Sequence, residues 1–348
     1  MDKYGIDSHK LMYHPREVSK WIDGEDFYPI YIEISPSNGC NHRCRFCSFD
    51  FTGYQTELLD YKLFEKNVPL MAKGGVKAVM FAGEGEPLIH PRFAEIVQLF
   101  GINKIDTALT TNGSLMTKEM SAKTLPYFSW IKFSVDAATP ETHAYLHGCN
   151  EDDFDKVMTN IKDAIDLRDS RHYKCTIGAQ AVLFRENKDE LVDLAIKLRQ
   201  LGADYLVIKP FTDHQYRSKL DLHVDYDNFY IDFSKNIRRF SDDKFPVILR
   251  DKTFHDLTVD RCYRNCHALN FWSYIDSYGD VYACSNFLGN QDYVYGNLYK
   301  NTFDQIWEDR HKRKIKVDLR DCRQICRMDK INQYLDGFVK QQDGVNFI

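Results

Sequence analysis

Short runs of β-branched and aromatic residues alternate with longer amphipathic stretches between residues 28 and 210. The short runs predict strands, near 30–34, 77–82, 105–111, 130–136, 174–183 and 204–209. The amphipathic stretches between them predict helices, near 60–73, 91–100, 117–125, 152–169 and 188–201. Six strands separated by helices indicate a parallel α/β sheet, and right-handed crossovers would curl it into a partial (β/α)6 barrel.

The pattern changes after the sixth predicted strand. Residues 211–255 are rich in charged and aromatic positions and predict one helix, near 224–239. Beyond them, alternating side chains on both sides of Gly279 predict a β-hairpin, and an amphipathic helix is expected from Phe303. We therefore divide the chain into a lead-in (1–27), the partial barrel (28–215), a helical connector (216–255), a small cysteine-rich domain (256–330) and a tail (331–348).

Composition narrows the class of protein. A chain of 348 residues with 43% hydrophobic content can bury the core of a large domain and a smaller one. Because the net charge is −5, we expect neither a nucleic acid nor a membrane as partner. The largest basic cluster, at 311–316, has acidic neighbours and is interpreted as a solvated helix face. No signal peptide is visible and no apolar run approaches the roughly 18 residues that span a bilayer, so a cytoplasmic protein is expected.

Ten cysteines are present, and eight of them fall into two groups. The first group is Cys40, Cys44 and Cys47, and the second is Cys262, Cys266, Cys284, Cys322 and Cys326. In a cytosolic chain such groups favour metal or cluster ligands over disulfides, because the cytosol keeps thiols reduced. The remaining two, Cys149 and Cys175, are expected to be small buried apolar side chains.

The first group has the spacing C-x3-C-x2-C. Three thiols this close can bind one metal ion or cluster, but they leave a fourth ligand position for another ligand. Soft thiolates select zinc, copper or iron–sulfur clusters. A structural zinc site closes with four protein ligands, and the nearest candidate for the fourth, His42, lies inside the loop. A zinc loop and three unrelated thiols therefore stay open at this point.

The same spacing resembles the cluster loop of the radical S-adenosylmethionine (radical SAM) superfamily. The resemblance implies that Cys40, Cys44 and Cys47 hold three irons of a 4Fe–4S cluster and that the fourth iron chelates SAM. It also places Phe46, the aromatic residue before the third cysteine, near the adenine. By the same resemblance, an electron from a donor of the flavodoxin or ferredoxin type cleaves SAM into methionine and a 5′-deoxyadenosyl radical, which takes a hydrogen atom from the substrate.

A glycine-rich loop, Gly83 to Pro87, follows the second predicted strand. Ligands of α/β proteins gather at the carboxyl ends of strands, and glycine lets a backbone approach a ligand closely. The loop resembles the family's G-G-E-P motif, whose backbone binds the amino group of SAM. Glu84 stands where the family has its first glycine, so Gly85, Glu86 and Pro87 are the matched part.

Polar residues also end the later predicted strands. The resemblance implies that they meet SAM or the substrate, and the candidates are Asn112, Ser134, Asp136, Gln180 and Lys209. Asn112 and Asp136 fit ordinary turn chemistry equally well. Lys209 would either bind an anion of the substrate or extend its ammonium to solvent.

The second cysteine group resembles the SPASM/twitch extension of radical SAM enzymes, because Cys266-x12-Gly279-x4-Cys284 fits its C-x(9–15)-G-x4-C pattern. The count of cysteines fits the smaller twitch arrangement, which implies one auxiliary 4Fe–4S cluster. Its ligands would be Cys266, Cys284, Cys322 and Cys326. The three residues between the last pair depart from the usual two, and a zinc site of four thiolates stays open.

These features predict a radical SAM oxidoreductase. An auxiliary cluster that accepts an electron favours a two-electron oxidation, such as a dehydrogenation. Cys262 is left over, as an inert thiol, an alternative ligand or a hydrogen donor in an epimerisation. Only about 27 residues precede the first predicted strand, which is short for a peptide-recognition domain, so a small polar metabolite such as a sugar or aminocyclitol is favoured over a peptide. A non-catalytic zinc or cluster protein that binds a partner is the remote alternative.

Overall fold

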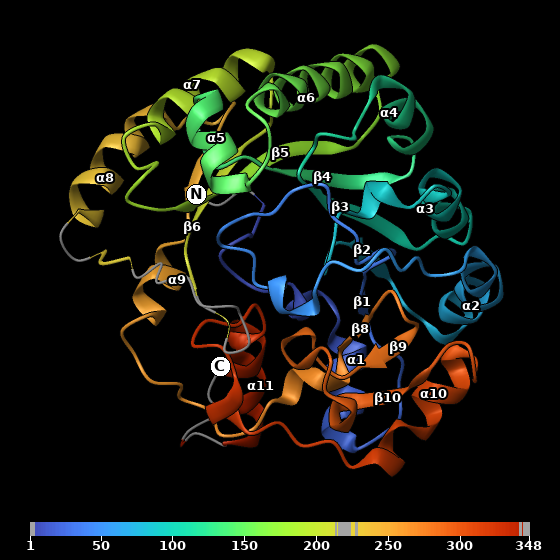
Figure 1. Ribbon diagram of the computed structural model, residues 1–348. Coiled ribbons are helices and arrows are strands. Elements are labelled where there is room, and N and C mark those ends of the chain that lie inside the picture. Colours follow the sequence, from blue (N-terminus) through green and yellow to red (C-terminus); the bar gives the residue numbers. More distant parts are fainter. Residues whose placement is uncertain (1–3, 213, 215–223, 227–228, 341–342, 344–348) are drawn as a thin grey trace.

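The computed structural model describes residues 4–212, 214, 224–226, 229–340 and 343 (Figure 1). Six parallel strands follow one another in chain order in the middle of one sheet. They are β1 (Tyr31–Ile34), β2 (Ala78–Phe81), β3 (Asp106–Thr111), β4 (Phe128–Ser134), β5 (Thr176–Leu183) and β6 (Leu206–Pro210). Figure 1 shows them curled into a partial barrel with helices on the outside, which confirms the expected fold.

The outer helices connect these strands. They are α2 (Tyr61–Gly74), α3 (Phe93–Ile102), α4 (Lys118–Thr124), α5 (Pro140–His147), α6 (Asp152–Arg171) and α7 (Leu191–Leu201). The sequence pattern predicted all of these except α5. This eight-residue helix begins with a proline at its first position and presents almost no apolar stripe, so periodicity carries little signal for it.

The two faces of the curled sheet differ in burial. On β4, Ile131 and Phe133 face the helices and are 0% exposed, whereas Lys132 and Ser134 on the inner face stay partly exposed. The same alternation along β5 and β6 places Gln180 and Lys209 on the inner face. The apolar core therefore lies between sheet and helices, while the polar inner face remains accessible to solvent.

The cysteine-rich region continues the sheet of the barrel, a connection that the sequence pattern did not predict. β8 (Trp272–Ile275) pairs in parallel with β1, and β9 (Asp280–Tyr282) and β10 (Val294–Asn297) extend the sheet as antiparallel strands. The expected hairpin around Gly279 is the β8–β9 connection. Its pairing with β1 joins segments some 240 positions apart along the chain, which local periodicity cannot reveal.

The connector contributes a strand as well as helices. β7 (Val247–Leu249) adds to the β6 edge of the sheet, and the helix expected near 224–239 is observed as α8 (Tyr230–Ile237). The other helices are α1 (Pro15–Asp23), α9 (Asp251–Asp256), α10 (Phe303–Asp309) and α11 (Asp329–Val339). The basic cluster at 311–316 is exposed as expected, but it forms only a short 3-10 turn, Arg310–Arg313, because Lys314 adopts a left-handed conformation.

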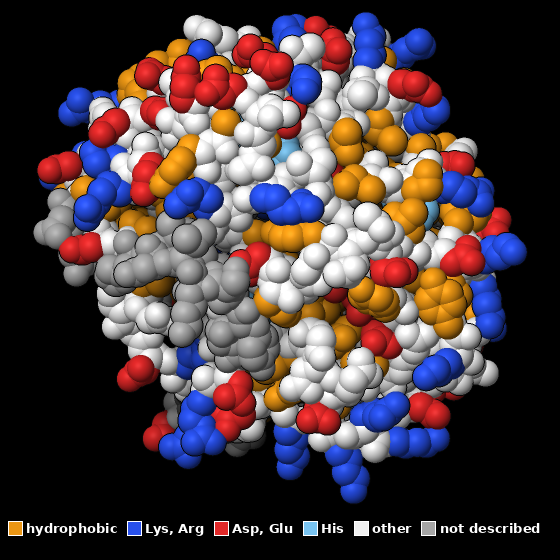
Figure 2. Space-filling model, in the orientation of Figure 1, with side chains coloured by type: hydrophobic (Ala, Val, Ile, Leu, Met, Phe, Trp, Pro, Cys, Tyr) orange, Lys and Arg blue, Asp and Glu red, His pale blue; other side chains and the backbone are white. Residues whose placement is uncertain are grey.

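The start of the described chain packs against the amino-terminal end of the barrel. Tyr4 and Ile6 contact the apolar cluster of Tyr205, Val207 and Ile248 on the inner side of β6 and β7. No helix in the described ranges is long and apolar enough to cross a membrane. Figure 2 shows Lys and Arg side chains interspersed with Asp and Glu around the rim of the viewed face.

Candidate active site

The loop that carries Cys40, Cys44 and Cys47 follows β1 and enters the carboxyl-terminal end of the barrel (Figure 1). Its backbone is fixed to the end of α5, because Arg43 N donates to His147 O at 3.0 Å and Arg45 N donates to Leu146 O at 2.9 Å. Gly148 caps α5, and a Cβ there would lie 2.2 Å from the Arg43 carbonyl oxygen. The helix that the sequence pattern missed is thus the support of the cysteine loop.

The three thiols lie close enough to interact electrostatically. Burial, together with the neighbouring Glu86 and Cys47, raises the pKa of Cys40 to about 12. Burial and the other two thiols also raise the pKa of Cys44. Without a metal these groups are protonated at neutral pH, and a cluster that binds them must displace the protons.

The spacing of the sulfur atoms bears on the zinc alternative. Four thiolates around one zinc ion lie about 3.8 Å apart, given the tetrahedral geometry and the Zn–S distance. Among the described residues, two groups have ligand atoms that all lie within 4.8 Å of one another: His42, Cys44 and His147, and His42, His143 and Cys149. The sulfurs of Cys40, Cys44 and Cys47 are not among the groups that meet this limit.

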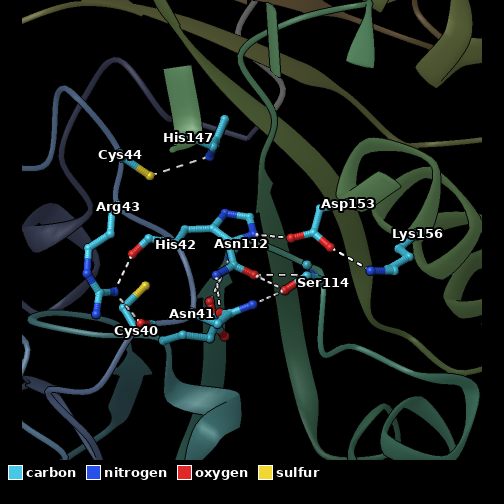
Figure 3. A network of polar contacts seen from close by, with 12 residues as sticks. Cys40, Asn41, His42, Arg43, Cys44, Asn112, Ser114, His147, Asp153 and Lys156 are labelled. Atoms are coloured by element: carbon cyan, nitrogen blue, oxygen red, sulfur yellow. Dashed lines mark hydrogen bonds and ion pairs between the residues drawn. The ribbon is translucent and has the colours of Figure 1, made fainter. Parts of the chain in front are cut away.

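A buried histidine, His147, lies beside Cys44 of the cysteine loop (Figure 3). His147 Nδ1 is 3.5 Å from Cys44 Sγ, and its Nε2 is 2.9 Å from Asp136 Oδ2. Asp136 Oδ1 in turn accepts a hydrogen bond from Val182 N at 2.5 Å. Asp136, which sequence analysis placed near SAM or the substrate, therefore has both carboxylate oxygens engaged by the protein.

Two further imidazoles pack around His147. His143 stacks on it with ring centroids 4.2 Å apart, and His42 Nε2 is 3.3 Å from Asp153 Oδ2. Burial lowers the pKa of His143 to about 2 and that of His42 to about 4. Sequence analysis considered only His42 among these residues. The His-x3-His spacing on one helical face was the available signal for the other two, but it depends on recognising α5.

The loop from Gly83 to Pro87 makes two close backbone contacts. A Cβ at Gly85 would lie 2.2 Å from the Gly39 carbonyl oxygen, and a Cβ at Gly83 would lie 2.1 Å from the Tyr274 hydroxyl oxygen. Gly83 also has a φ of +122°, which side chains rarely tolerate. Both positions therefore require glycine, and Gly85 holds the loop against the start of the cysteine loop.

Glu86 fixes the same loop to the end of β3. Its Oε1 accepts from Thr111 Oγ1 at 2.7 Å and its Oε2 accepts from Asn112 N at 2.8 Å. Burial raises the pKa of this carboxyl group to about 7. Asn112 donates from Nδ2 to Asn41 Oδ1 at 2.9 Å and accepts from Ser114 N at 3.0 Å. The side chains of Glu86 and Asn112 thus hold neighbouring loops together. That these two residues contact SAM remains a prediction.

Glu84 departs from the family motif and has a structural partner. Its carboxylate accepts from Ser277 Oγ at 3.2 Å in the β8–β9 turn. Burial raises the pKa of Glu84 to about 7. Burial and the nearby Glu84 raise the pKa of Asp276, in the same turn, to about 8. The Glu84 side chain, which stands where the family motif has a glycine, therefore connects the barrel to the cysteine-rich hairpin.

Of the remaining residues that sequence analysis expected in the site, Phe46 makes apolar contacts and the other three lie on the inner face. Phe46 packs on Phe184, with ring centroids 5.1 Å apart, and on the edge of His147. Ser134, Gln180 and Lys209 lie on the inner face, where sequence analysis missed Lys132. The available signal was its place between two buried apolar residues of one strand, which in a half-buried strand marks the opposite face.

Four cysteines of the second group lie together beside the barrel. Cys322, Cys266 and Cys326 all interact electrostatically with Cys284, and burial raises the pKa of each of the four. Three N–H groups donate to their sulfurs: Asn332 Nδ2 to Cys266 at 3.5 Å, Asn286 N to Cys284 at 3.4 Å and Met328 N to Cys326 at 3.4 Å. Such donors are typical around thiolates that bind a cluster.

Cys262 is more exposed than the other four cysteines of this group. Its side chain is exposed, and its carbonyl oxygen accepts a hydrogen bond from Lys340 Nζ at 2.7 Å. Cys175 is buried, whereas Cys149 is only partly buried and lies near His42 and His143.

Two arginines next to Cys322 and Cys326 join this region to the barrel. Arg327 Nη1 lies 2.6 Å from Glu33 Oε2 on the inner face of β1. Arg323 Nη2 donates to Ser48 Oγ at 2.9 Å, just after the first cysteine loop, and to Thr212 O at 3.0 Å, just after β6. The segment with Cys322 and Cys326 therefore spans from β1 to the end of β6 and borders the inner face.

Comparison with protein families gives two matches. Residues 34–204 match the model described as the radical SAM superfamily, and residues 266–328 match the model of the SPASM iron–sulfur cluster-binding domain. The boundaries of the two matches enclose the first cysteine group and the four clustered cysteines of the second.

Several curated proteins resemble the chain. GTP 3′,8-cyclase of Chlorobaculum tepidum is 30% identical over 190 residues, which cover 53% of this chain and 55% of the relative. An S-adenosylmethionine-dependent nucleotide dehydratase of Selenomonas ruminantium is 32% identical over 205 residues, 58% of this chain and 69% of the relative. The subtilosin biosynthesis protein AlbA of Bacillus subtilis is 22% identical and covers 80% of this chain and 59% of the relative.

Among solved structures, SuiB of Streptococcus suis bound to its precursor peptide SuiA superposes with a TM-score of 0.65. It is 18% identical and covers 85% of this chain and 69% of that one. At this identity the match establishes a shared fold.

Proposed function

The chain belongs to the radical SAM superfamily and carries a C-terminal SPASM iron–sulfur domain, and on this basis we propose that it oxidises a substrate held at the inner face of its barrel. The cofactors of such a protein are SAM and iron–sulfur clusters. The proposed reaction is a two-electron oxidation of a substrate carbon, of the dehydrogenase type.

The first cysteine group is proposed to hold the cluster that binds SAM. Cys40, Cys44 and Cys47 supply three thiolates and leave one iron for SAM. When bound, the SAM-binding cluster supplies a 5′-deoxyadenosyl radical that takes a hydrogen atom, and an auxiliary cluster supplies an acceptor for a second electron. The backbone at Gly85, the ring of Phe46 and the hydroxyl of Ser134 are proposed to position SAM.

The observation that carries the oxidative assignment is the placement of the four clustered cysteines. With Cys266, Cys284, Cys322 and Cys326 all as ligands, a 4Fe–4S cluster has no open iron for substrate and is suited to electron transfer. Arg327 connects this site to Glu33 on the inner face, where the substrate would lie, and Arg323 connects it to Thr212, just after β6. The proposed electron transfer from substrate to this site rests on these contacts at the border of the inner face.

Epimerisation with Cys262 as hydrogen donor has less support. Such a donor must reach the radical carbon inside the barrel, and the Cys262 side chain is exposed. We therefore favour oxidation as the reaction.

The relatives do not point to one substrate class. Two of the proteins above are named for nucleotides, whereas AlbA is named for the biosynthesis of the bacteriocin subtilosin and SuiB is seen bound to a precursor peptide. The preference for a sugar or aminocyclitol over a peptide therefore receives no support from these names. Peptide modification is a second candidate, favoured by the coverage of 80% of this chain by AlbA and 85% by SuiB.

The experiment is an anaerobic assay of the reconstituted full-length chain with SAM and a reductant, with 5′-deoxyadenosine and methionine quantified. Nucleotides, sugar phosphates and peptide mixtures are then added in separate reactions, with deuterated solvent as a parallel arm. An oxidised product with one 5′-deoxyadenosine formed per turnover supports the proposal. A product isomeric with its substrate, carrying one solvent deuterium, would instead assign an epimerase.

A further inference from the structure

Two lysines occupy the inner face of the barrel. Lys132 lies in the middle of β4 and Lys209 near the end of β6, and both keep partial exposure. Their direct neighbours Ile131 and Ile208 are 0% exposed because they pack against the outer helices. The two ammonium groups therefore project towards the solvent-accessible interior of the barrel.

Neither lysine has an acidic partner among the described residues. Lys132 Nζ is 3.4 Å from Gln180 Oε1 and 5.2 Å from the centre of the Trp130 ring. For Lys209, the described part of the chain provides neither a hydrogen bond nor an ion pair. An ammonium group that has lost much of its water without gaining a counter-charge is costly, so this arrangement calls for an anion from outside the protein.

The carboxylates nearby already have cationic or imidazole partners. The pairs are Glu33 with Arg327, Asp136 with His147, and Asp7 with Arg250. Burial, followed by the charges of Arg250 and Lys132, lowers the pKa of Lys209 to about 7. Burial and nearby arginines likewise lower the pKa of Lys132 to about 8. A bound anion would stabilise the charged form of both lysines, which their present surroundings disfavour.

We propose that Lys132 and Lys209 form a binding site for an anionic group of the substrate, either a phosphate or a carboxylate. Gln180 lies on β5 between the two lysine-bearing strands and can turn its amide group to the same anion. Such a group would pair both charges and hold the rest of the substrate near the carboxyl-terminal end of the barrel. The inference rests on the proposed function, because it takes the inner face as the place where the substrate binds.

The test is isothermal titration of reconstituted full-length protein, saturated with SAM, with inorganic phosphate and separately with acetate. We expect the wild type to bind one of these anions, and Lys132→Met and Lys209→Met each to weaken that binding at least about tenfold. Lys123→Met, on the exposed surface of α4, is the control and should bind as the wild type does. If phosphate binds more tightly than acetate, the substrate group is a phosphate, and if acetate binds more tightly, it is a carboxylate.

Three results would overturn the anion site. The first is that neither anion binds the wild type, and the second is that both lysine variants bind the anion as tightly as the wild type does. The third is that Lys209→Met loses SAM affinity tenfold while phosphate displaces SAM. The last would assign the lysines to the SAM carboxylate. Iron content and SAM cleavage of the same samples test the proposed function separately. A wild type without SAM cleavage would refute that function, whereas lysine-dependent anion binding would still support the site.

Discussion

Arg327 and Glu33 form a two-pronged ion pair between the cysteine-rich C-terminal segment and the inner face of β1. Arg327 Nη1 lies 2.6 Å from Oε2 and Nη2 lies 3.2 Å from Oε1. Glu33 is 2% exposed, so its carboxylate depends on this partner for its counter-charge. The pair fixes the position of Cys326, the neighbouring residue in the chain, relative to the barrel.

Arg327→Met should destabilise the protein, because it leaves the Glu33 carboxylate buried without a partner. We expect a loss of about 2 kcal/mol, below the usual cost of breaking a buried pair because the arginine side chain is 44% exposed. The measurement is urea unfolding of the reduced protein. The double variant Glu33→Gln/Arg327→Met should recover part of the loss, and equal losses in the single and double variants would contradict this account.

His147 is expected to tune the first cluster. A cluster-bound Cys44 is a thiolate and can only accept. With protons on both ring nitrogens, His147 would donate from Nε2 to Asp136 and from Nδ1 to Cys44 across 3.5 Å, and the second hydrogen bond would stabilise the reduced cluster. His147→Phe should lower the reduction potential by about 45 mV, which corresponds to roughly 1 kcal/mol for one electron.

Electron paramagnetic resonance during a redox titration measures this potential. His255→Phe changes an exposed histidine and serves as the control. A potential unchanged in His147→Phe at full iron content would show that the hydrogen bond is not made to the cluster ligand.

Gly83 should tolerate no side chain. A Cβ there would overlap the hydroxyl oxygen of the buried Tyr274 and the φ of +122° adds strain, so Gly83→Ala should cost about 3 kcal/mol or more. Gly289→Ala is the matched control, since Gly289 has a φ of +80° but no atom within 4 Å of an added Cβ. It should cost only about 1–2 kcal/mol of backbone strain. Equal urea midpoints for the two variants would contradict the close contact with Tyr274.

The stability of the protein should fall as the pH rises through 7. The folded-state pKa of Glu84 is raised from 4.5 to about 7, so folded protein binds this proton more tightly than unfolded protein. The resulting stabilisation is complete below about pH 4.5 and is lost as the pH rises through the folded-state pKa.

Glu84→Gln should therefore flatten the decline between pH 5 and 7 by roughly 2 kcal/mol. Urea midpoints across this range measure the effect, with the exposed Glu65→Gln as the control. An unchanged slope in Glu84→Gln would show that Glu84 does not carry the proton. Asp276 and Glu86 also have raised pKa values and should leave a residual slope.

Strands with clear alternation could be predicted from the sequence, and β4 shows why. Ile131 and Phe133 had to face a core, and this same requirement places Lys132 and Ser134 on the opposite face. The cysteine spacings likewise predicted the family and the kinds of cofactor. These signals are local, or depend on a few fixed residue types.

What could not be predicted depends on contacts between distant segments. The pairing of β8 with β1 and the ion pair of Arg327 with Glu33 join opposite ends of the chain, and no local pattern encodes them. The roles of the side chains at strand ends could not be predicted from the sequence either. Asn112 has the same sequence signature whether it meets a cofactor or, as the structure has it, binds Asn41 and Ser114.

The most direct test of the central claim is the iron content and SAM cleavage of three variants, purified and reconstituted without oxygen. The wild type should carry about eight irons, enough for two four-iron clusters. Cys44→Ala should lose about four irons and all SAM cleavage, and Cys284→Ala should lose about four irons but still form 5′-deoxyadenosine. Cys262→Ala should keep the wild-type iron content. Zinc in place of iron, with no 5′-deoxyadenosine from the wild type, would contradict the account.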